Sequence, residues 1–399
     1  MKNNYELLAP AGNYEKAEIA LNYGADAIYI GPKAYSLRAR ASNFDIQEIE
    51  SITKYAHSKN KKVYVVLNII CRNAHVPGFA NYFRKISECK VDGIICADPF
   101  IIKSIHEIDP KMTIHISTQQ SISNSKSALF WKRNNAERVV LAREVDYNNL
   151  EKIVNKTKDL IEIEYFIHGA VCISYSGRCT MSNNFSYRDS NVGGCAHSCR
   201  WNYKVNNNKN KIENFTMSAK DMNLISDLDK LLSLDIASFK IEGRMKSIHY
   251  IATIVSSYKK AIDEYMHNKK INNLYVEETK KAENRLTSNA YFDGNADYSK
   301  MLYSSDERMV NQNFAFLVDE DLGDNFYLVT AKNNFNKNYD FECISYNHEN
   351  FKFRISEIIN EEGINIDVVI TPMRKYKVKV IGNNKLSYLD IIRISNKEL

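Results

Sequence analysis

Short β-type runs that alternate with amphipathic helical segments most strongly limit the folds open to this chain. Several of the helical segments carry start signals: Asn13 precedes one, Asp45 with Glu48 forms a capping box, and Asp98 precedes a proline. Eight such β/α units predict an α/β fold, a (β/α)8 TIM-like barrel, with a doubly wound open sheet as the alternative. The eight expected strands are residues 6–9, 27–31, 63–68, 93–97, 114–118, 138–142, 163–168 and 238–242.

Barrel enzymes carry their chemistry at the carboxyl ends of the strands, so the expected strand ends predict the residues of the mouth. Most of these residues are polar. They are Pro10, Gly12, Tyr29, Gly31, Asn68, Asp98, Ser117 to Gln120, Arg143, Glu144, His168, Glu242 and Arg244.

The connection between the seventh and eighth expected strands is unusually long, from about residue 170 to 235. It holds Cys172, Cys179, Cys195 and Cys199, four of the eight cysteines of the chain, within 28 residues. Long excursions from barrel loops are usually functional, so we expect an insertion with a cysteine site.

Disulfides, zinc, an iron–sulfur cluster or a thiol nucleophile could each explain such a cluster. The N-terminal sequence MKNNYELLAPAG lacks the apolar core of a signal peptide, so we expect reduced thiols in a cytoplasmic protein. Zinc prefers two short cysteine pairs, and only Cys195 and Cys199 form one; iron–sulfur clusters tolerate irregular spacing. A thiolate–imidazolium pair of Cys172 with His168 stays conceivable. The spacing favours a [4Fe–4S] cluster, with zinc as the alternative.

Glycines and arginines flank the four cysteines. Glycines let backbone N–H groups turn toward sulfur, and arginines would stabilise an anionic tetrathiolate cluster. The residues concerned are Gly169, Gly177, Gly193, Gly194, Arg178, Arg188 and Arg200. The other cysteines, Cys71, Cys89, Cys96 and Cys343, are expected to be ordinary buried or half-buried thiols.

The pattern changes toward the C-terminus. Residues 248–266 and 276–286 are expected to be helical, and after them alternating runs separated by Asn, Asp and Gly turns predict a small antiparallel β-barrel or sandwich. We therefore expect a barrel domain at 1–266, a helical linker at 267–309 and a small all-β domain at 310–399. The alternating runs are 314–318, 326–330, 341–345, 351–355, 364–370, 376–381 and 391–394.

The charge is unevenly distributed. Residues 310–399 hold 11 Lys+Arg and 13 Asp+Glu, so the net charge of +6 for the whole chain becomes +8 on residues 1–309. Basic residues interleaved with aromatic ones near the cysteines, such as Arg188, Trp201 and Lys246, suit an unstacked base of single-stranded RNA. No apolar run approaches the ~20 residues that cross a bilayer, so we expect a soluble protein without membrane contact.

Four segments resemble the signature of the peptidase U32 family, historically called collagenase-like. They are EYFIHGAVCISYSGRCTMS at 164–182, ELLAPAG at 6–12, STQ at 117–119 and KIEGRMK at 240–246. The resemblance spans about residues 5–265. Some relatives place a cysteine just before the KIEGR strand, where this chain has Ala237, so Cys199 is the fourth nearby candidate.

The resemblance implies an RNA hydroxylase rather than a protease. Members of this kind hydroxylate the wobble uridine of tRNA, a cytidine of ribosomal RNA or a quinone precursor, and a cluster held by four cysteines recurs. The length and the appended β domain are most similar to the tRNA hydroxylation branch, which implies 5-hydroxylation of uridine 34 in the anticodon loop, prephenate as co-substrate, and an electron donor or homologous partner subunit.

Site roles follow from the mouth positions, the basic and aromatic residues near the cysteines and, for Glu242 and Arg244, the resemblance. Together these favour His168, Glu242 and Arg244 as catalytic residues, and Gln119, Arg143, Arg188, Trp201 and Lys246 as substrate-binding residues. Neither H-E-x-x-H nor G-x-S-x-G occurs in the sequence. A U32-type peptidase and a non-catalytic iron–sulfur redox or scaffold protein remain the alternative functions.

Overall fold

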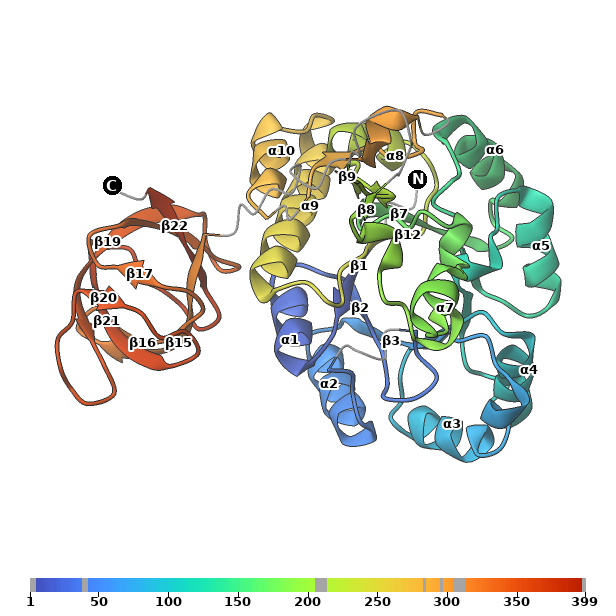
Figure 1. Cartoon of the computed structure of the whole chain (residues 1–399), viewed down its shortest axis with the longest axis horizontal. Helices are drawn as coiled ribbons and strands as arrows, with labels where there is room; N and C mark the ends of the chain where they lie inside the picture. Colours follow the sequence, from blue (N-terminus) through green and yellow to red (C-terminus); the bar gives the residue numbers. More distant parts are fainter. Residues whose placement is uncertain are drawn as a thin grey trace.

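A large α/β body and a small all-β body make up the protein (Figure 1). The computed structural model describes residues 5–37, 42–204, 214–282, 285–294, 297–303 and 313–396.

Eight parallel strands form a closed barrel in the large body. Each strand pairs with the next along the chain, and the last, β12, pairs with both β7 and β1, which closes the barrel. The TIM-like barrel is thereby confirmed and the open doubly wound sheet is wrong. The strands are β1 Glu6–Ala11, β2 Ala27–Ile30, β3 Lys62–Leu67, β4 Gly93–Cys96, β5 Ile114–Ile116, β6 Arg138–Val140, β7 Glu162–Gly169 and β12 Ser238–Ile241.

Helices surround this barrel, and the expected start signals hold. The Asn13 side chain accepts a hydrogen bond from the backbone N–H of Lys16, Asp45 and Glu48 form the reciprocal capping box, and Asp98 caps its helix ahead of Pro99. The helices are α1 Tyr14–Asn22, α2 Ile46–Ser58, α3 Phe79–Glu88, α4 Pro99–Ile108, α5 Ser125–Arg133, α6 Tyr147–Thr157, α8 Leu228–Leu232, α9 Ile248–Asn268 and α10 Asn273–Lys280. In the described part of the chain, no helix combines the length and apolarity needed to cross a membrane.

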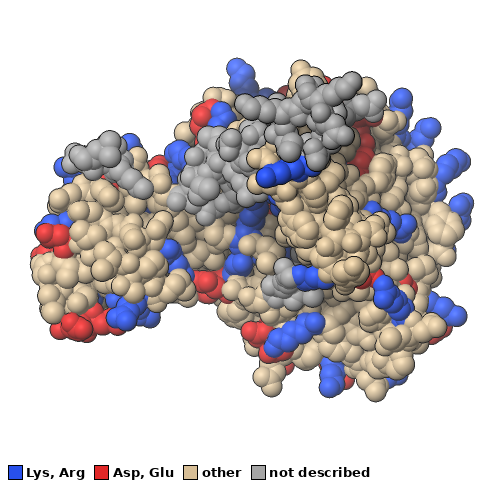
Figure 2. All heavy atoms as spheres, in the orientation of Figure 1, with Lys and Arg blue, Asp and Glu red and all other residues tan. Residues whose placement is uncertain are grey.

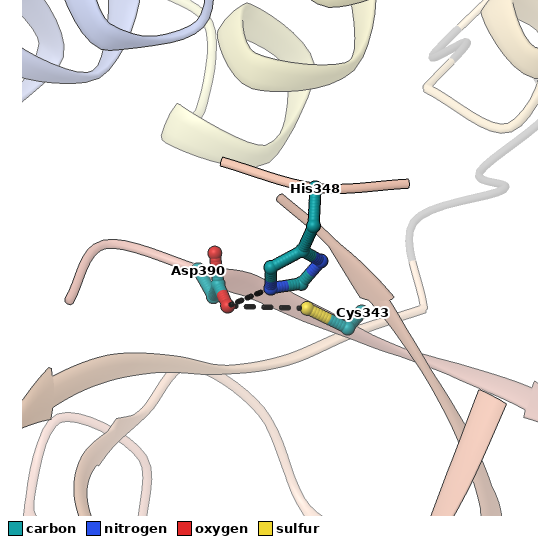
Figure 3. A group of neighbouring side chains, drawn as sticks. All are labelled: Cys343, His348 and Asp390. Carbon is teal, nitrogen blue, oxygen red and sulfur yellow. Dashed lines mark hydrogen bonds and ion pairs between the residues drawn. The ribbon is translucent and has the colours of Figure 1, made fainter. Parts of the chain in front are cut away.

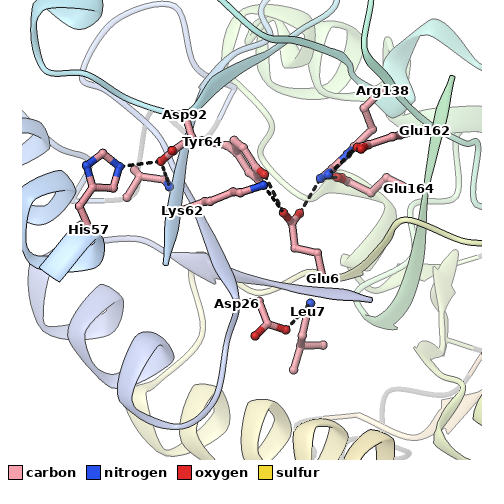
Figure 4. A network of polar contacts seen from close by, with 11 residues as sticks. Glu6, Leu7, Asp26, His57, Lys62, Tyr64, Asp92, Arg138, Glu162 and Glu164 are labelled. Atoms are coloured by element: carbon pink, nitrogen blue, oxygen red, sulfur yellow. Dashed lines mark hydrogen bonds and ion pairs between the residues drawn. The ribbon is translucent and has the colours of Figure 1, made fainter. Parts of the chain in front are cut away.

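Paired charges fill the interior of the barrel at the end where the strands begin (Figure 4). The Arg138 guanidinium lies 2.5 Å from a Glu6 carboxylate oxygen and 3.3 Å from one of Glu164. The Lys240 ammonium lies 2.6 Å from the other oxygen of Glu164, whose side chain is fully buried. Because removing one member of a buried ion pair costs about 3–5 kcal/mol, this network ties strands from different parts of the sequence together.

The insertion between β7 and β12 runs over the barrel (Figure 1, green) and contains short elements. Its last strand returns to the barrel by pairing antiparallel with the end of β7, where Met222 lies opposite Gly169. The elements of the insertion include α7 Met181–Ser186, β8 Tyr203–Lys204, β9 Asn214–Phe215, β10 Ser218–Ala219 and β11 Asp221–Asn223. Strands β13 Thr287–Ser288 and β14 Met301–Leu302 pair with β11 and β10.

The small body is a closed antiparallel barrel of six strands in the order β15, β16, β21, β19, β18, β22, as the alternating runs predict. The run at 364–370 is wrong as a barrel strand: its only strand residues, β20 Val368–Val369, pair with β17 Phe335–Asn336 outside the barrel, and Ile364 and Ile370 are exposed. The barrel strands are β15 Phe314–Gly323, β16 Phe326–Ala331, β18 Asp340–Ile344, β19 Phe351–Ile359, β21 Lys375–Ile381 and β22 Ile391–Asn396.

The two bodies share part of one apolar core, which includes Ile344, Leu389 and Ile391 of the small body. The hydroxyl of Tyr23, at the end of α1, is central to their contact. It donates to the carbonyl oxygen of Ile344 at 2.7 Å and accepts from the backbone N–H of Ile391 at 3.2 Å. Burial raises the pKa of Tyr23, so this hydroxyl stays protonated and able to donate.

Candidate active site at the barrel mouth

A cavity of about 170 Å³ lies at the carboxyl ends of the barrel strands, beneath the insertion. Barrel residues form one wall and the insertion forms the other. Eight of the predicted site residues line it: Cys172, Cys179, Cys195, Cys199, Gln119, Arg143, Glu242 and Arg244.

The four cysteines surround this cavity as a mutually interacting group. The backbone N–H of Met181 donates to Cys179 Sγ at 3.3 Å, and the backbone of Ser174 donates to Cys172. Burial raises the pKa of Cys172 and of Cys199, and the charges of the neighbouring thiols raise both further. Such a group gains from binding a positively charged centre, because thiolates are then stabilised by the metal.

The spacing of the sulfurs bears on what this group could hold. Zn–S bonds of about 2.3 Å bring tetrahedral thiolates within about 3.8 Å of one another. All four cysteines belong to the described residues, and no three of their sulfurs lie within 4.8 Å of one another. The sulfurs are therefore not drawn together as four thiolates on one zinc ion are, and N–H groups are directed at two of them.

Contacts to the barrel hold the insertion over the cavity. The Arg72 guanidinium forms an ion pair with Asp189, and the backbone N–H of Ile70 donates to the carbonyl of Asn191 at 3.0 Å. On the other side, Glu144 accepts from the backbone N–H of Ser176 at 2.8 Å. The cysteine loops are therefore fixed to the loops that follow two strands, β3 and β6, and Glu144 belongs to this support.

Three cations and one carboxylate give the barrel wall its charge. Arg143 lies with its guanidinium 3.7 Å from the Phe166 ring centre and 3.9 Å from the Glu242 carboxylate. Burial lowers the pKa of Lys240, although Glu164 opposes that shift. Arg244 is 3% exposed and donates to the Ser36 hydroxyl at 3.0 Å. An excess of buried positive charge suits an anionic ligand.

Glycines make room for the loop that carries Glu242 and Arg244. A Cβ atom at Gly12 would lie 2.2 Å from the Arg244 carbonyl oxygen. At Gly169, which has a φ of +109°, a Cβ atom would lie 2.3 Å from the Glu242 carbonyl oxygen. Glycine is therefore needed at these two strand ends because another stretch of backbone approaches too closely for a side chain.

His168 does not line the cavity. The pairing of β12 with β7 shifts register, so that Lys240 lies opposite Phe166 but Ile241 lies opposite His168. This bulge interrupts the alternation that would have placed His168 beside Phe166. The ring instead packs on Tyr250 and Tyr258, and burial lowers its pKa to about 4. It does not form the conceivable pair with Cys172.

Lys246, Arg188 and Trp201 also lie outside the set of cavity-lining residues. Lys246 forms an ion pair with Asp221 at 3.3 Å, so a carboxylate of the same chain already balances its positive charge. Arg188 and Trp201 belong to the insertion. Trp201 is 41% exposed and stands near Phe185, with ring centres 6.5 Å apart.

Exposed aromatic side chains cluster on the insertion. Tyr187 is 97% exposed, and Tyr175, Phe185 and Trp201 are also exposed. Figure 2 shows Lys and Arg side chains distributed over the face of the large body that carries the insertion. Flat aromatic surfaces with cations nearby suit stacking of unpaired bases.

Lys240 and Ser36 are site residues that the sequence did not single out. Lys240 lines the cavity, and Ser36 holds Arg244. The strand pattern of residues 238–242 could have identified Lys240, because it places residue 240 on the same face of the strand as Glu242. Ser36 had no comparable signal, since it lies in a loop.

Comparisons with known proteins agree with this architecture. Residues 12–302 match the family model described as peptidase family U32, and residues 311–393 match that of the family U32 C-terminal domain. The chain is 41% identical over 390 residues to tRNA hydroxylation protein P1 of Bacillus subtilis (strain 168), covering 94% of this chain and 92% of the relative.

More distant relatives carry two kinds of name. The chain is 33% identical over 308 residues to tRNA hydroxylation protein P of Escherichia coli (strain K12), covering 65% of this chain and 68% of the relative. It is 31% identical over 278 residues to a protein of Porphyromonas gingivalis named collagenase, covering 66% of each. With the family model spanning the barrel and its cysteine insertion, the chain belongs to peptidase family U32.

Proposed function

We propose that this protein hydroxylates tRNA, adding the oxygen at C5 of the wobble uridine, position 34, with a [4Fe–4S] cluster on its four clustered cysteines. The observation that carries the proposal is one cavity lined by all four cysteines and by the cationic strand ends of the barrel. The naming of the relatives from B. subtilis and E. coli supports the choice of tRNA as the substrate.

The cluster would be held by Cys172, Cys179, Cys195 and Cys199, and when bound it would supply one-electron chemistry. The protein's own part is to fix the four sulfurs and to limit water around them. Burial of Cys172 and the N–H groups at Cys172 and Cys179 serve this purpose.

The barrel wall would bind and orient the two organic reactants. Prephenate, the proposed oxygen source, is a dicarboxylate, and the guanidinium groups of Arg143 and Arg244 line the cavity that would hold it. Glu242 is placed to take up the proton that leaves C5 of the uracil when oxygen replaces hydrogen there. Its Oε2 already accepts from the Tyr29 hydroxyl at 3.2 Å, which orients the carboxylate toward the cavity that both residues line.

The anticodon loop would approach over the insertion. Uridine 34 must leave its stack to enter the cavity, and the exposed ring of Trp201 offers a surface on which a neighbouring base can stack. The reaction would take place in the cytoplasm, where tRNA is available.

Peptidase activity finds less support in the geometry. A nucleophilic cysteine needs a lowered pKa and a histidine in contact, whereas burial raises the pKa of Cys172 and His168 contacts Tyr258.

The test is a nucleoside analysis of tRNA from a strain lacking this protein and any second family member. We expect 5-hydroxyuridine-derived nucleosides at position 34 to disappear, and the wild-type gene to restore them. A Cys179→Ser copy should not restore them, whereas a Cys89→Ser copy should, because Cys89 is a buried thiol just after α3 that does not line the cavity. An unchanged nucleoside profile in the deletion strain would refute the proposal.

A further inference from the structure

Three potential metal ligands meet in the small barrel, away from the mouth of the large one (Figure 3). Cys343 lies on β18, His348 in the following loop and Asp390 just before β22. One ligand atom from each lies within 4.8 Å of the other two. Cys343 was expected to be an ordinary buried thiol, and the tertiary structure gives it these two neighbours.

The histidine presents its lone pair to this group. His348 Nδ1 lies 3.0 Å from the carbonyl oxygen of Glu349, and a carbonyl only accepts, so this nitrogen carries the proton. In the neutral ring, Nε2 is then an acceptor, and it lies 3.6 Å from Asp390 Oδ2, another acceptor. Metal-bound histidines characteristically donate their second nitrogen to a carbonyl in this way.

Asp390 is fully buried, and only part of its carboxylate is satisfied. Its Oδ2 accepts from the backbone N–H of Ser387 at 2.8 Å and from the Cys343 thiol at 3.4 Å. The Ser345 hydroxyl also hydrogen-bonds this carboxylate, and among the described residues Oδ1 itself meets no donor in standard hydrogen-bond geometry. A buried carboxylate so placed is costly unless a cation accompanies it.

Two of the three distances between ligand atoms match those on a tetrahedral ion. With Zn–S near 2.3 Å and Zn–N and Zn–O near 2.1 Å, ligand atoms on one zinc ion stand about 3.3–3.6 Å apart. The observed Sγ to Oδ2 distance is 3.4 Å, and the Nε2 to Oδ2 distance is 3.6 Å. Sulfur, imidazole and carboxylate are together the ligand types that zinc takes in proteins.

We propose that Cys343, His348 and Asp390 bind a zinc ion through Sγ, Nε2 and Oδ2, with water as the fourth ligand. Binding displaces the thiol proton of Cys343 to solvent. Water can reach the ion along His348, whose side chain is 32% exposed, while the other two ligands are fully buried.

The position of the site gives the ion a structural role. Ile344 follows Cys343 and Ile391 follows Asp390, and both are held by the hydroxyl of Tyr23 from the large barrel. An ion that joins β18 to the start of β22 therefore fixes the two backbone groups that Tyr23 binds across the domain contact.

The experiment measures zinc in the full-length protein after dialysis against a weak chelator. Wild type should retain one equivalent of zinc, and so should Cys89→Ser, whose thiol contacts the carbonyl oxygens of Ile46 and Lys85. His348→Ala and Cys343→Ser should lose at least about 90% of it, since losing even an outer-shell partner weakens metal binding ~10–100-fold. A Cys172→Ser/Cys179→Ser variant should keep the zinc, which separates this site from the four-cysteine cavity.

Cobalt provides the second measurement. Protein carrying Cys172→Ser and Cys179→Ser and loaded with Co²⁺ should show a sulfur-to-cobalt charge-transfer band that Cys343→Ser abolishes. Zinc content unchanged in His348→Ala, or wild-type protein that takes up neither ion, would overturn the proposal and leave a direct His348–Asp390 ion pair. Because His348 lies in a partly exposed loop, His348→Ala tests the site even if Cys343→Ser fails to fold.

Discussion

The guanidinium of Arg244 occupies the space that a side chain at Gly31 would need. A Cβ atom at position 31 would lie 1.6 Å from Arg244 Nη1. The backbone of Gly31 is outside the left-handed region, so an alanine there meets steric obstacles alone, from Arg244 and from Ser36 Oγ at 2.8 Å. Position 31 therefore has to be glycine for Arg244 to reach the cavity.

Gly31→Ala should displace Arg244 and leave the barrel folded. We expect overpacking to lower the free energy of unfolding by about 1–3 kcal/mol, and 5-hydroxyuridine-derived nucleosides to fall more than about tenfold. Ser36→Ala is the matched comparison, because it removes one hydrogen bond to Arg244 and adds no atom. Ser36→Ala should lower both the free energy of unfolding and the level of modified nucleosides less than Gly31→Ala does. Equal modification by Gly31→Ala and wild type would show that Arg244 is not needed in this position.

Anaerobically prepared protein should contain about four iron and four sulfide per chain. Cys172→Ser, Cys179→Ser and Cys195→Ser should each lose the cluster, because each removes a ligand from the cavity. Cys199→Ser tests the fourth ligand, which lines the same cavity. Iron and sulfide analysis with absorption spectra provides the measurement. Zinc without sulfide at these four cysteines would contradict the prediction.

Trp201→Ala and Lys204→Ala should weaken RNA binding in different ways. Loss of stacking at Trp201, which is 41% exposed, should weaken the free energy of RNA binding by about 1–3 kcal/mol at any salt concentration. Loss of one phosphate contact at Lys204 should reduce the slope of log K against log salt by ~0.7. Titrations of an anticodon stem-loop at several salt concentrations distinguish the two. Identical slopes and affinities in both variants and wild type would place the RNA elsewhere.

His249→Phe should make the protein less sensitive to acid. Burial, with help from Arg393, lowers the pKa of His249 to about 3, and neither ring nitrogen has a hydrogen-bond partner among the described residues. The unfolded chain takes up this proton near pH 6.5 and the folded chain near pH 3. The contribution of neutral His249 to the free energy of unfolding is therefore fully present above pH 6.5 and is lost as the pH falls from 6.5 toward 3. Between pH 7 and pH 5 this one group should lower the free energy of unfolding of wild type by about 2 kcal/mol.

Urea unfolding at both pH values gives the measurement. Phenylalanine keeps the ring that stacks on Phe314, with ring centres 5.6 Å apart in wild type. The other buried histidines, His115 and His168, are common to both proteins, so their contributions cancel. The same loss of stability in variant and wild type would show that His249 is not responsible.

The sequence by itself determined the two barrels and the chemistry of the mouth. Periods of 2 and 3.6 residues, and caps such as Asp45 with Glu48, are local properties, so the eight strands of the large barrel could be placed within a few residues of their observed bounds. The carboxyl-end rule then gathered Gln119, Arg143, Glu242 and Arg244 around one cavity.

Tertiary structure alone decided where individual side chains point and which distant residues meet. A bulge between β7 and β12 turns His168 toward Tyr258, and the ion pair with Asp221 occupies Lys246. Cys343 and Asp390 are 47 positions apart and meet because their strands pair in the small barrel. Local sequence patterns carry no information on such contacts, since register shifts and strand pairing depend on the packing of the whole domain.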